Sequence, residues 1–258
     1  ATDGFARTGV VHTARGSFRT PCFMPVGTRA AVRTLTSADL EKLGAEVILG
    51  NTYHLMLKPG ADLIERFDGL HGFADWHGHV LTDSGGFQIF SLEPKVNDEG
   101  ATFKSTYDGS YHHLSPEGSV EVQQKLGSDI QMVLDVCPPL PSSEAVVRGA
   151  LERSVLWAGR AKAAQAPARE SGSKQAQFGI VQGGIDVAMR TESAERTLEI
   201  GFDGFGIGGL SVGETRAEML PALAAVTDVL PTDRPRYLMG VGDPVSIVEA
   251  VAHGVDMF

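Results

Sequence analysis

The residues best suited to chemistry in this sequence lie in one stretch, Leu81–Gln88, which reads Leu-Thr-Asp-Ser-Gly-Gly-Phe-Gln. Two apolar residues, Val80 and Leu81, lead into an acid, a hydroxyl and two glycines. This order indicates a buried strand that delivers Asp83 to a loop where a ligand can lie against bare backbone. The alternative is a tight strand-to-helix turn with Asp83 or Ser84 as the helix N-cap. The stretch alone leaves both interpretations open.

The same arrangement recurs where other predicted strands end. Together these positions supply two acids, side-chain amides, backbone N–H groups, an aromatic ring and a thioether. Such a set suits a planar heterocycle, because a carboxylate accepts from paired N–H donors, amides donate to a carbonyl, and apolar groups cover the ring. The positions are Asn51 and His54; Asp83, Ser84, Gly85, Gly86 and Phe87; Asp135 and Cys137; Gln182; Gly208, Gly209 and Leu210; and Met239 and Gly240.

Each of these residues also has a structural interpretation. Asp135 could cap the turn that follows it, Met239 could belong to the core, and Gln182 could hold its own loop. Other kinds of site are poorly supported. No group of His, Cys and acidic residues has metal-ligand spacing, and the glycine pairs contain no Lys or Arg that would favour phosphate.

The elements that position these residues alternate between strand and helix, which implies a parallel sheet. Seven strands and the start of an eighth favour a TIM (β/α)8 barrel over an open doubly wound sheet. We therefore predict an α/β fold, one incomplete TIM-barrel domain over residues 1–258, ending at the start of strand eight. The expected strands are 22–26, 47–49, 80–82, 130–136, 178–181, 204–207 and 237–239, with an N-terminal hairpin over 10–19 and an inserted β-hairpin over 95–113.

Composition sets limits on the partners and the compartment. The chain of 258 residues is 42% hydrophobic, carries a net charge of −10 and contains no apolar run that approaches a membrane span. Phosphate contacts need Lys and Arg, so the charge argues against nucleic-acid binding over the whole surface, although not against a basic patch. The only cysteines, Cys22 and Cys137, share no metal spacing, which suits a reducing cytoplasm.

Five motifs, in this order, resemble the tRNA-guanine transglycosylases of the bacterial queuosine pathway. They are Gly50–Leu55, Leu81–Gln88, Gly179–Gly184, Gly208–Glu214 and Tyr237–Gly242, within a likeness that runs from about Arg7 to Phe258. The resemblance implies a modified TIM barrel that exchanges the wobble guanine of GUN-anticodon tRNAs. The incoming base would be 7-aminomethyl-7-deazaguanine, and the expected mechanism is a retaining double displacement.

The resemblance also implies roles by position. Asp83 would act as general acid or base and would be held by Asn51. Asp135 would accept from the Watson–Crick edge of the base, while Gln182 and the Gly209 N–H would address its carbonyl oxygen. The physics agrees, because exchange with retention needs an attacking carboxylate and a second group that manages the proton of the leaving base.

Other positions would complete the substrate site. Phe87 and Met239 would stack on the base, and Leu210 with Ser211 would lie near its exocyclic substituent, braced by Glu214. Val212 and Cys137 match the bacterial pattern, which favours the small aminomethyl base over queuine. The remaining predicted positions are Ser84, Gly85, Gly86 and Gly208 in the base pocket, and Gly240, Val241, Gly242, Asp243, Pro244, Val245 and Ser246 along the tRNA.

The sequence departs from the family at its C-terminal end. The expected nucleophile is an aspartate directly after Asp256-Met257-Phe258, and the basic segment and a structural zinc site of three cysteines and one histidine would lie further on. We therefore expect part of a longer, homodimeric protein. On this expectation the chain presents a base pocket but forms no covalent tRNA intermediate, and it lacks an eighth strand, which leaves apolar sheet edges open.

Two other functions compete with the enzyme. One is a non-catalytic barrel subunit that binds tRNA or a partner, and the other is an archaeal-type relative that acts elsewhere in tRNA. The intact set of Asp83, Asp135 and Gln182 argues against the subunit, since a protein without the reaction need not keep it.

Overall fold

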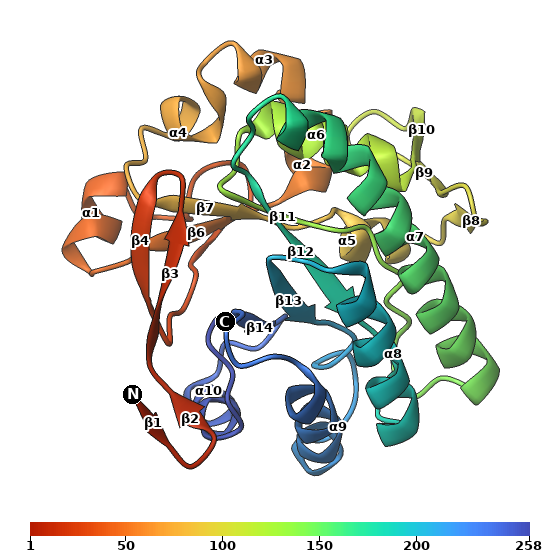
Figure 1. Cartoon of the computed structure of the whole chain (residues 1–258). Coiled ribbons are helices and arrows are strands. Elements are labelled where there is room, and N and C mark those ends of the chain that lie inside the picture. The colour runs from red at the N-terminus through yellow and green to blue at the C-terminus, as the bar shows by residue number, and fades with distance from the viewer.

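A curled sheet of seven parallel strands lies at the centre of the computed structural model, which describes residues 1–258 (Figure 1). Every neighbouring pair in this sheet runs parallel. The predicted α/β class is confirmed, and the curled parallel sheet fits a TIM-like barrel. In spatial order the strands are β14 (Arg236–Leu238), β13 (Gly204–Ile207), β12 (Ala176–Val181), β11 (Ile130–Met132), β7 (His79–Thr82), β6 (Val47–Gly50) and β5 (Val26–Gly27).

Helices connect the strands, and the larger ones pack around the outside of the sheet (Figure 1). None of them combines the length and the apolar character that crossing a lipid bilayer requires. The helices are α1 (Ser37–Lys42), α2 (Thr52–Leu57), α3 (Ala61–Glu65), α4 (Gly69–Ala74), α5 (Gly86–Phe90), α6 (Pro116–Leu126), α7 (Glu144–Glu170), α8 (Val187–Ile200), α9 (Arg216–Val229) and α10 (Pro244–Ala252).

Local sequence signals set the ends of several helices. At α6 the Ser115 hydroxyl accepts from the Gly118 N–H at 3.1 Å, and Pro116 occupies the first turn, where its missing N–H costs nothing. The same helix ends at Gly127, whose φ of 65° is strained for other residues. Thr215 and Glu218 form a capping box at the start of α9.

The insertion after α5 has three strands, where a two-stranded hairpin over 95–113 was expected. It forms a three-stranded antiparallel sheet of β8 (Lys95–Val96), β9 (Ala101–Lys104) and β10 (Tyr111–Leu114). The sequence did not predict β8, because a strand of two residues is too short to show an alternation of apolar and polar side chains. Apolar side chains of β9 pack on α2 and α7, and the loop after β9 is tied to α2 by the Tyr53 hydroxyl, 3.0 Å from Thr106 Oγ1.

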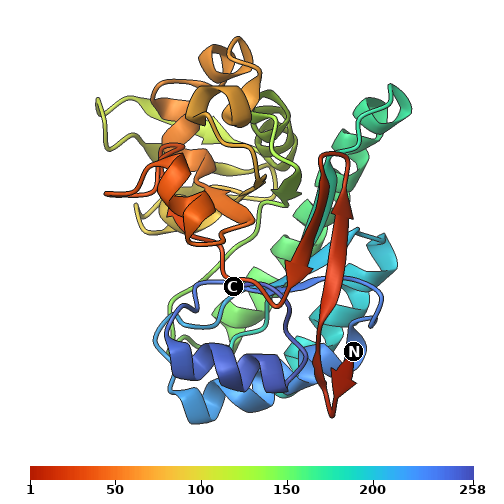
Figure 2. The same cartoon turned by 90° about the vertical axis from the view of Figure 1, so that its left-hand side faces the viewer.

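The N-terminal segment lies at the end of the sheet at which the strands begin. It contains β1 (Thr2–Asp3), β2 (Ala6–Arg7), β3 (Gly9–Thr13) and β4 (Gly16–Thr20). Figure 2 shows the β3–β4 hairpin standing along one side of the molecule. Its tip contacts the starts of β7 and β11, while Arg7 at its base pairs with Asp256.

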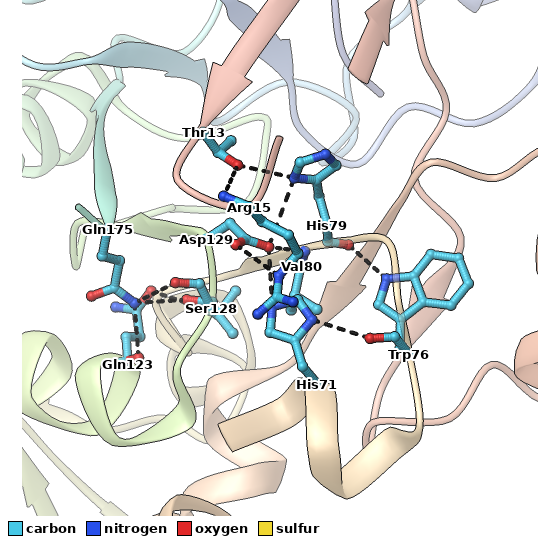
Figure 3. Close-up of polar contacts among 11 residues, drawn as sticks. Thr13, Arg15, His71, Trp76, His79, Val80, Gln123, Ser128, Asp129 and Gln175 are labelled. Carbon is cyan, nitrogen blue, oxygen red and sulfur yellow. Dashed lines mark hydrogen bonds and ion pairs between the residues drawn. The ribbon is translucent and has the colours of Figure 1, made fainter. Parts of the chain in front are cut away.

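A buried carboxylate, Asp129, holds the hairpin tip to the sheet (Figure 3). It accepts from the Val80 N–H at 2.8 Å and lies 3.1 Å from His71 Nε2 and 3.3 Å from Arg15 Nε. Burial opposes its ionisation, but the close His71 side chain and the hydrogen bond from the Val80 N–H outweigh burial, so the pKa of Asp129 is lowered. The ionised group therefore stabilises the fold above its unfolded pKa, and this stabilisation is lost as the pH falls.

We expect Asp129→Ala to lower the free energy of unfolding by about 3 kcal/mol, because it leaves buried donors without their acceptor. Urea unfolding near pH 7 measures the change, and the difference from wild type should shrink in acid. Glu41→Ala, which removes an exposed partner of His77, is the matched control and should change stability little. Equal effects of the two substitutions would contradict the role given to Asp129.

The last four residues, 255–258, pair with both edges of the sheet. The Met257 carbonyl accepts from the Leu238 N–H at 3.0 Å, and the Phe258 carbonyl accepts from the Met24 N–H at 2.7 Å. Bridges join Met257 to Tyr237 on one side and to Cys22 on the other, both parallel. The expectation that this chain leaves the sheet edges open is therefore wrong here, since these residues lie between them and are at most 4% exposed.

Candidate active site

Predicted positions from four strand ends meet at the end of the sheet where the strands finish. Asp83 follows β7, Asp135 follows β11, Gln182 follows β12, and Gly208 with Gly209 follows β13. Carboxyl ends of neighbouring parallel strands share one edge, which is where barrels of this class place their sites. The hairpin and Asp129 lie at the opposite end of the sheet, where the strands begin. The contacts that hold the hairpin to the sheet are therefore distant from the candidate active site.

Three donors hold the Asp83 carboxylate. Asn51 Nδ2 donates to Oδ2 at 2.6 Å, while the N–H groups of Thr52 and Gly85 donate to Oδ1 at 2.8 and 3.1 Å. The expected contact from Asn51 is therefore present. Asn51 is also the N-cap of α2, since its Oδ1 accepts from the His54 N–H at 3.0 Å.

The loop after Asp83 combines features of both sequence interpretations. A short helix, α5, does follow, but its N-cap is Gly85 with φ of 81°, and neither Asp83 nor Ser84 caps it. The glycine at position 86 lets two strand ends approach, because a Cβ there would lie 3.2 Å from Asp135 Oδ1. The loop is thus shaped for close packing beside the second carboxylate.

The second carboxylate, Asp135, is 5% exposed and pairs with Gln182. Gln182 Nε2 donates to Asp135 Oδ2 at 2.6 Å, and the Ser84 hydroxyl lies 3.5 Å from Oδ1. Asp135 therefore does not cap the turn that follows it. Asp135 and Gln182, which were both expected to contact the base, are hydrogen-bonded to each other in this structure.

Burial raises the pKa of both carboxyl groups, although hydrogen bonds from their neighbours oppose the shift. The pKa of Asp83 rises to about 7, with the nearby charge of Asp135 contributing, and the pKa of Asp135 rises to about 6. Near neutral pH, Asp83 is thus available both as an acid and as a base.

These raised pKa values predict a pH-dependent stability. The native state binds more protons than the unfolded chain between the unfolded value of 3.8 and the native values, so stability falls as the pH rises through about 7. Relative to wild type, the double variant Asp83→Asn/Asp135→Asn should gain thermal stability from pH 4.5 to about 7, above which the difference should level off. Parallel melting-temperature curves for the two proteins would contradict the raised values.

A buried arginine that sequence reasoning missed ties two site loops together. Arg190 of α8 is 0% exposed, and its Nε donates to the Gly184 carbonyl at 2.6 Å. Its Nη1 donates to the Gly208 carbonyl at 2.6 Å and its Nη2 to the Gly209 carbonyl at 2.9 Å. A helical signal was present, because Arg190 shares the face of Ser193, Ala194 and Thr197, all buried.

Hydrogen bonds to Glu214 and from Leu140 brace the loop after β13. The Glu214 carboxylate accepts from the Ser211 N–H, and also from the Val212 N–H at 3.0 Å. The Val212 carbonyl in turn accepts from the Leu140 N–H at 3.1 Å. These contacts fix the peptide that follows Gly209 and Leu210.

Similarity to known proteins identifies the family of this chain. A family model described as "TGT: Queuine tRNA-ribosyltransferase" matches residues 3–258. The chain belongs to this family.

Curated members of the queuine tRNA-ribosyltransferase family are similar over the whole chain. The protein named queuine tRNA-ribosyltransferase from Sphingopyxis alaskensis is 51% identical over 260 residues, which is 100% of this chain and 69% of the relative. The protein of the same name from Caulobacter vibrioides is 53% identical over 261 residues, with the same coverage. The chain thus spans a little over two thirds of these relatives, and the resemblance inferred from five motifs is confirmed.

Two predicted positions lie away from the Asp83–Asp135–Gln182 cluster. Phe87, expected to stack on the base, is 61% exposed on α5. His54, noted only for its place after a strand, has its Nδ1 2.8 Å from the Tyr107 hydroxyl. Met239, also expected to stack on the base, is partly buried and its sulfur packs beside Gly206 in β13.

The segment expected along the tRNA forms the start of α10. Asp243 is its N-cap and accepts from the Ser246 N–H at 3.0 Å. The side chains of Val241 and Ser246 are buried, so the segment presents Gly242 to Val245 on its surface.

Proposed function

We propose that this chain forms the base pocket, at Asp83, Asp135 and Gln182, of an enzyme that exchanges a guanine in tRNA for a 7-deazaguanine base. Its reaction class is that of the queuine tRNA-ribosyltransferase family, so the chain is a pentosyltransferase acting on tRNA. One observation carries the residue assignment. Two carboxyl groups with raised pKa values, partly buried Asp83 and buried Asp135, stand at neighbouring strand ends beside loops with backbone donors.

Base recognition uses the edge that carries N–H groups and a carbonyl. The Asp135 carboxylate accepts from the paired N–H donors of guanine, and the incoming base displaces the Gln182 amide from Oδ2. Gln182 then donates to the base carbonyl together with the Gly209 N–H, which donates to no protein oxygen in the structure. Buried, directional groups of this kind reject bases that lack their partners.

Asp83 manages the proton of the base. In the first displacement a carboxylate oxygen bonds to the ribose anomeric carbon, and guanine leaves with the electron pair of the glycosidic bond and a proton from Asp83. The second displacement reverses these steps, and the incoming base gives its proton to Asp83. A pKa of about 7 suits both transfers.

The attacking carboxylate is proposed from the family resemblance at the position that follows Phe258. The paired segment 256–258 supports this placement, because it runs parallel to β14 and points toward the same end of the sheet as Asp83. We take these residues as the start of the eighth strand of a (β/α)8 barrel.

The tRNA contacts are proposed at the start of α10. Exposed backbone from Gly242 to Val245 lies at a helix N-terminus, where N–H groups and the helix dipole favour phosphate. The proposed partners are GUN-anticodon tRNAs and the aminomethyl base, with a homodimer in the cytoplasm; these stand on the family resemblance.

The structural zinc implied by the resemblance does not fit these residues. The chain has two cysteines, Cys22 and Cys137, and no group of three or more His, Cys, Asp or Glu is placed to hold a metal. A site of three cysteines and one histidine would need ligands from outside residues 1–258.

Incorporation of labelled guanine into unmodified tRNA tests the activity. The assay compares the 258-residue chain with the same chain completed by the residues of the Sphingopyxis alaskensis relative that lie outside the match. Exchange that requires the added residues would support a nucleophile beyond Phe258. Exchange by the shorter chain would make Asp83 the nucleophile, and no exchange by either protein would favour the binding-subunit alternative.

A further inference from the structure

Arg190 carries a buried positive charge that forms no ion pair with a carboxylate, although the charge of Glu214 favours the charged guanidinium. Its hydrogen bonds go to the carbonyl oxygens of Val181, Gly184, Gly208 and Gly209. Burial lowers its pKa only to about 10, so the guanidinium is charged at neutral pH. A buried cation without an acid partner is costly, and its field acts on the surrounding site.

The peptide between Gly208 and Gly209 links this charge to the pocket. Arg190 Nη1 donates to the Gly208 carbonyl at 2.6 Å, and the N–H at the other end of the same peptide unit belongs to Gly209. A hydrogen bond to the carbonyl of a peptide polarises it, which makes its N–H a stronger donor. That N–H donates to no protein oxygen, its neighbour being the Cys137 sulfur, a weak acceptor, and it is the group proposed to meet the base carbonyl.

Glycine is required for this geometry. Gly209 has φ of 64°, and a Cβ there would lie 2.2 Å from Gln182 Oε1. The Gly209 backbone therefore lies close to both the Gln182 amide and the Arg190 guanidinium. The two groups proposed to address the base carbonyl, the Gln182 amide and the Gly209 N–H, therefore lie side by side, and Arg190 holds the Gly209 backbone.

We propose that Arg190 is a positioning residue that strengthens the Gly209 N–H as a donor to the base carbonyl oxygen. This inference rests on the proposed function of the pocket. When the glycosidic bond breaks, its electron pair passes to the leaving base, and part of that negative charge is carried by the carbonyl oxygen. A polarised, preorganised N–H stabilises this charge, as oxyanion-hole donors do.

The test measures how much binding depends on the base carbonyl. Equilibrium binding of guanine is compared with that of 6-thioguanine, which keeps the N–H edge but replaces the carbonyl oxygen by sulfur, a weak acceptor. The proteins are wild type, Arg190→Lys and Arg190→Met. Lysine keeps the charge but cannot reproduce the planar fork of donors.

Arg236 offers a matched control at the opposite end of the barrel. It is 5% exposed and also donates to backbone carbonyls, those of Leu230 and Gly254. Arg236→Lys therefore removes the same kind of buried fork and should lower the melting temperature comparably. It should leave the preference for guanine over 6-thioguanine unchanged, because it lies far from the pocket loops.

We expect Arg190→Lys to reduce the preference for guanine over the thio analogue about 5-fold, and Arg190→Met about 10-fold if it folds. A wild-type preference in Arg190→Lys would overturn the inference, and so would an equal loss in Arg236→Lys, since the effect would then follow stability. A wild-type protein that binds both bases equally would instead contradict the proposed carbonyl recognition itself.

Discussion

Asp83→Asn is expected to reduce guanine exchange at least 100-fold, which is the lower range for loss of a general acid or base. Asparagine keeps the shape of the side chain and can still accept from the Thr52 and Gly85 N–H groups, but it cannot exchange a proton with the base. The measurement is the rate of labelled-guanine incorporation into tRNA by the completed chain. Equilibrium binding of the free base should change much less than the rate.

The control for Asp83→Asn is the same substitution at an exposed acid. Asp62 pairs with Lys125 on the surface, and its side chain is 76% exposed. Asp62→Asn should leave exchange unchanged. If Asp83→Asn retains wild-type exchange, Asp83 does not carry the proton and the acid–base assignment fails.

Asp135→Asn is expected to weaken guanine binding about 100-fold, because buried polar groups left without partners are the strongest source of discrimination. The carboxylate offers two acceptors to two N–H donors, whereas an asparagine amide offers one acceptor and places an NH2 group against the other donor. Titration calorimetry with guanine measures the loss.

Stability separates this effect from misfolding. Burial raises the pKa of Asp135, so asparagine at this position should leave the melting temperature near pH 8 equal to or above that of wild type. Asp233→Asn, at an exposed pair with Arg234, should change neither binding nor stability. Unchanged guanine binding in Asp135→Asn would remove Asp135 from the recognition edge.

The positions at strand ends could be predicted because their signals are local. An apolar run that ends at an acid and two glycines identifies Asp83 and its loop wherever the strand lies in the sheet. Apolar runs that end at an acid, an amide or paired glycines recur at β11, β12 and β13, and they predicted that Asp135, Gln182 and Gly209 share one edge. Alternating strands and helices form a parallel sheet, so residues that follow different strands come together at one edge and form one site.

Contacts made between distant segments were not predictable in the same way. Arg190 acts through carbonyls of two loops, and no local pattern identifies which carbonyls an arginine will meet. The pairing of 255–258 with both sheet edges likewise depends on Cys22 and Tyr237, far away in sequence. The short helices α2 and α4 are too brief for a periodic pattern, and α2 depends on the Asn51 cap.

A crystal structure of this chain with guanine bound tests the proposed pocket most directly. We predict the N–H edge of the base on the Asp135 carboxylate. We also predict the base carbonyl within hydrogen-bond distance of Gln182 Nε2 and the Gly209 N–H, with Gln182 released from Asp135 Oδ2. Guanine bound elsewhere, or bound at this site with its carbonyl turned away from Gly209, would contradict the proposed recognition.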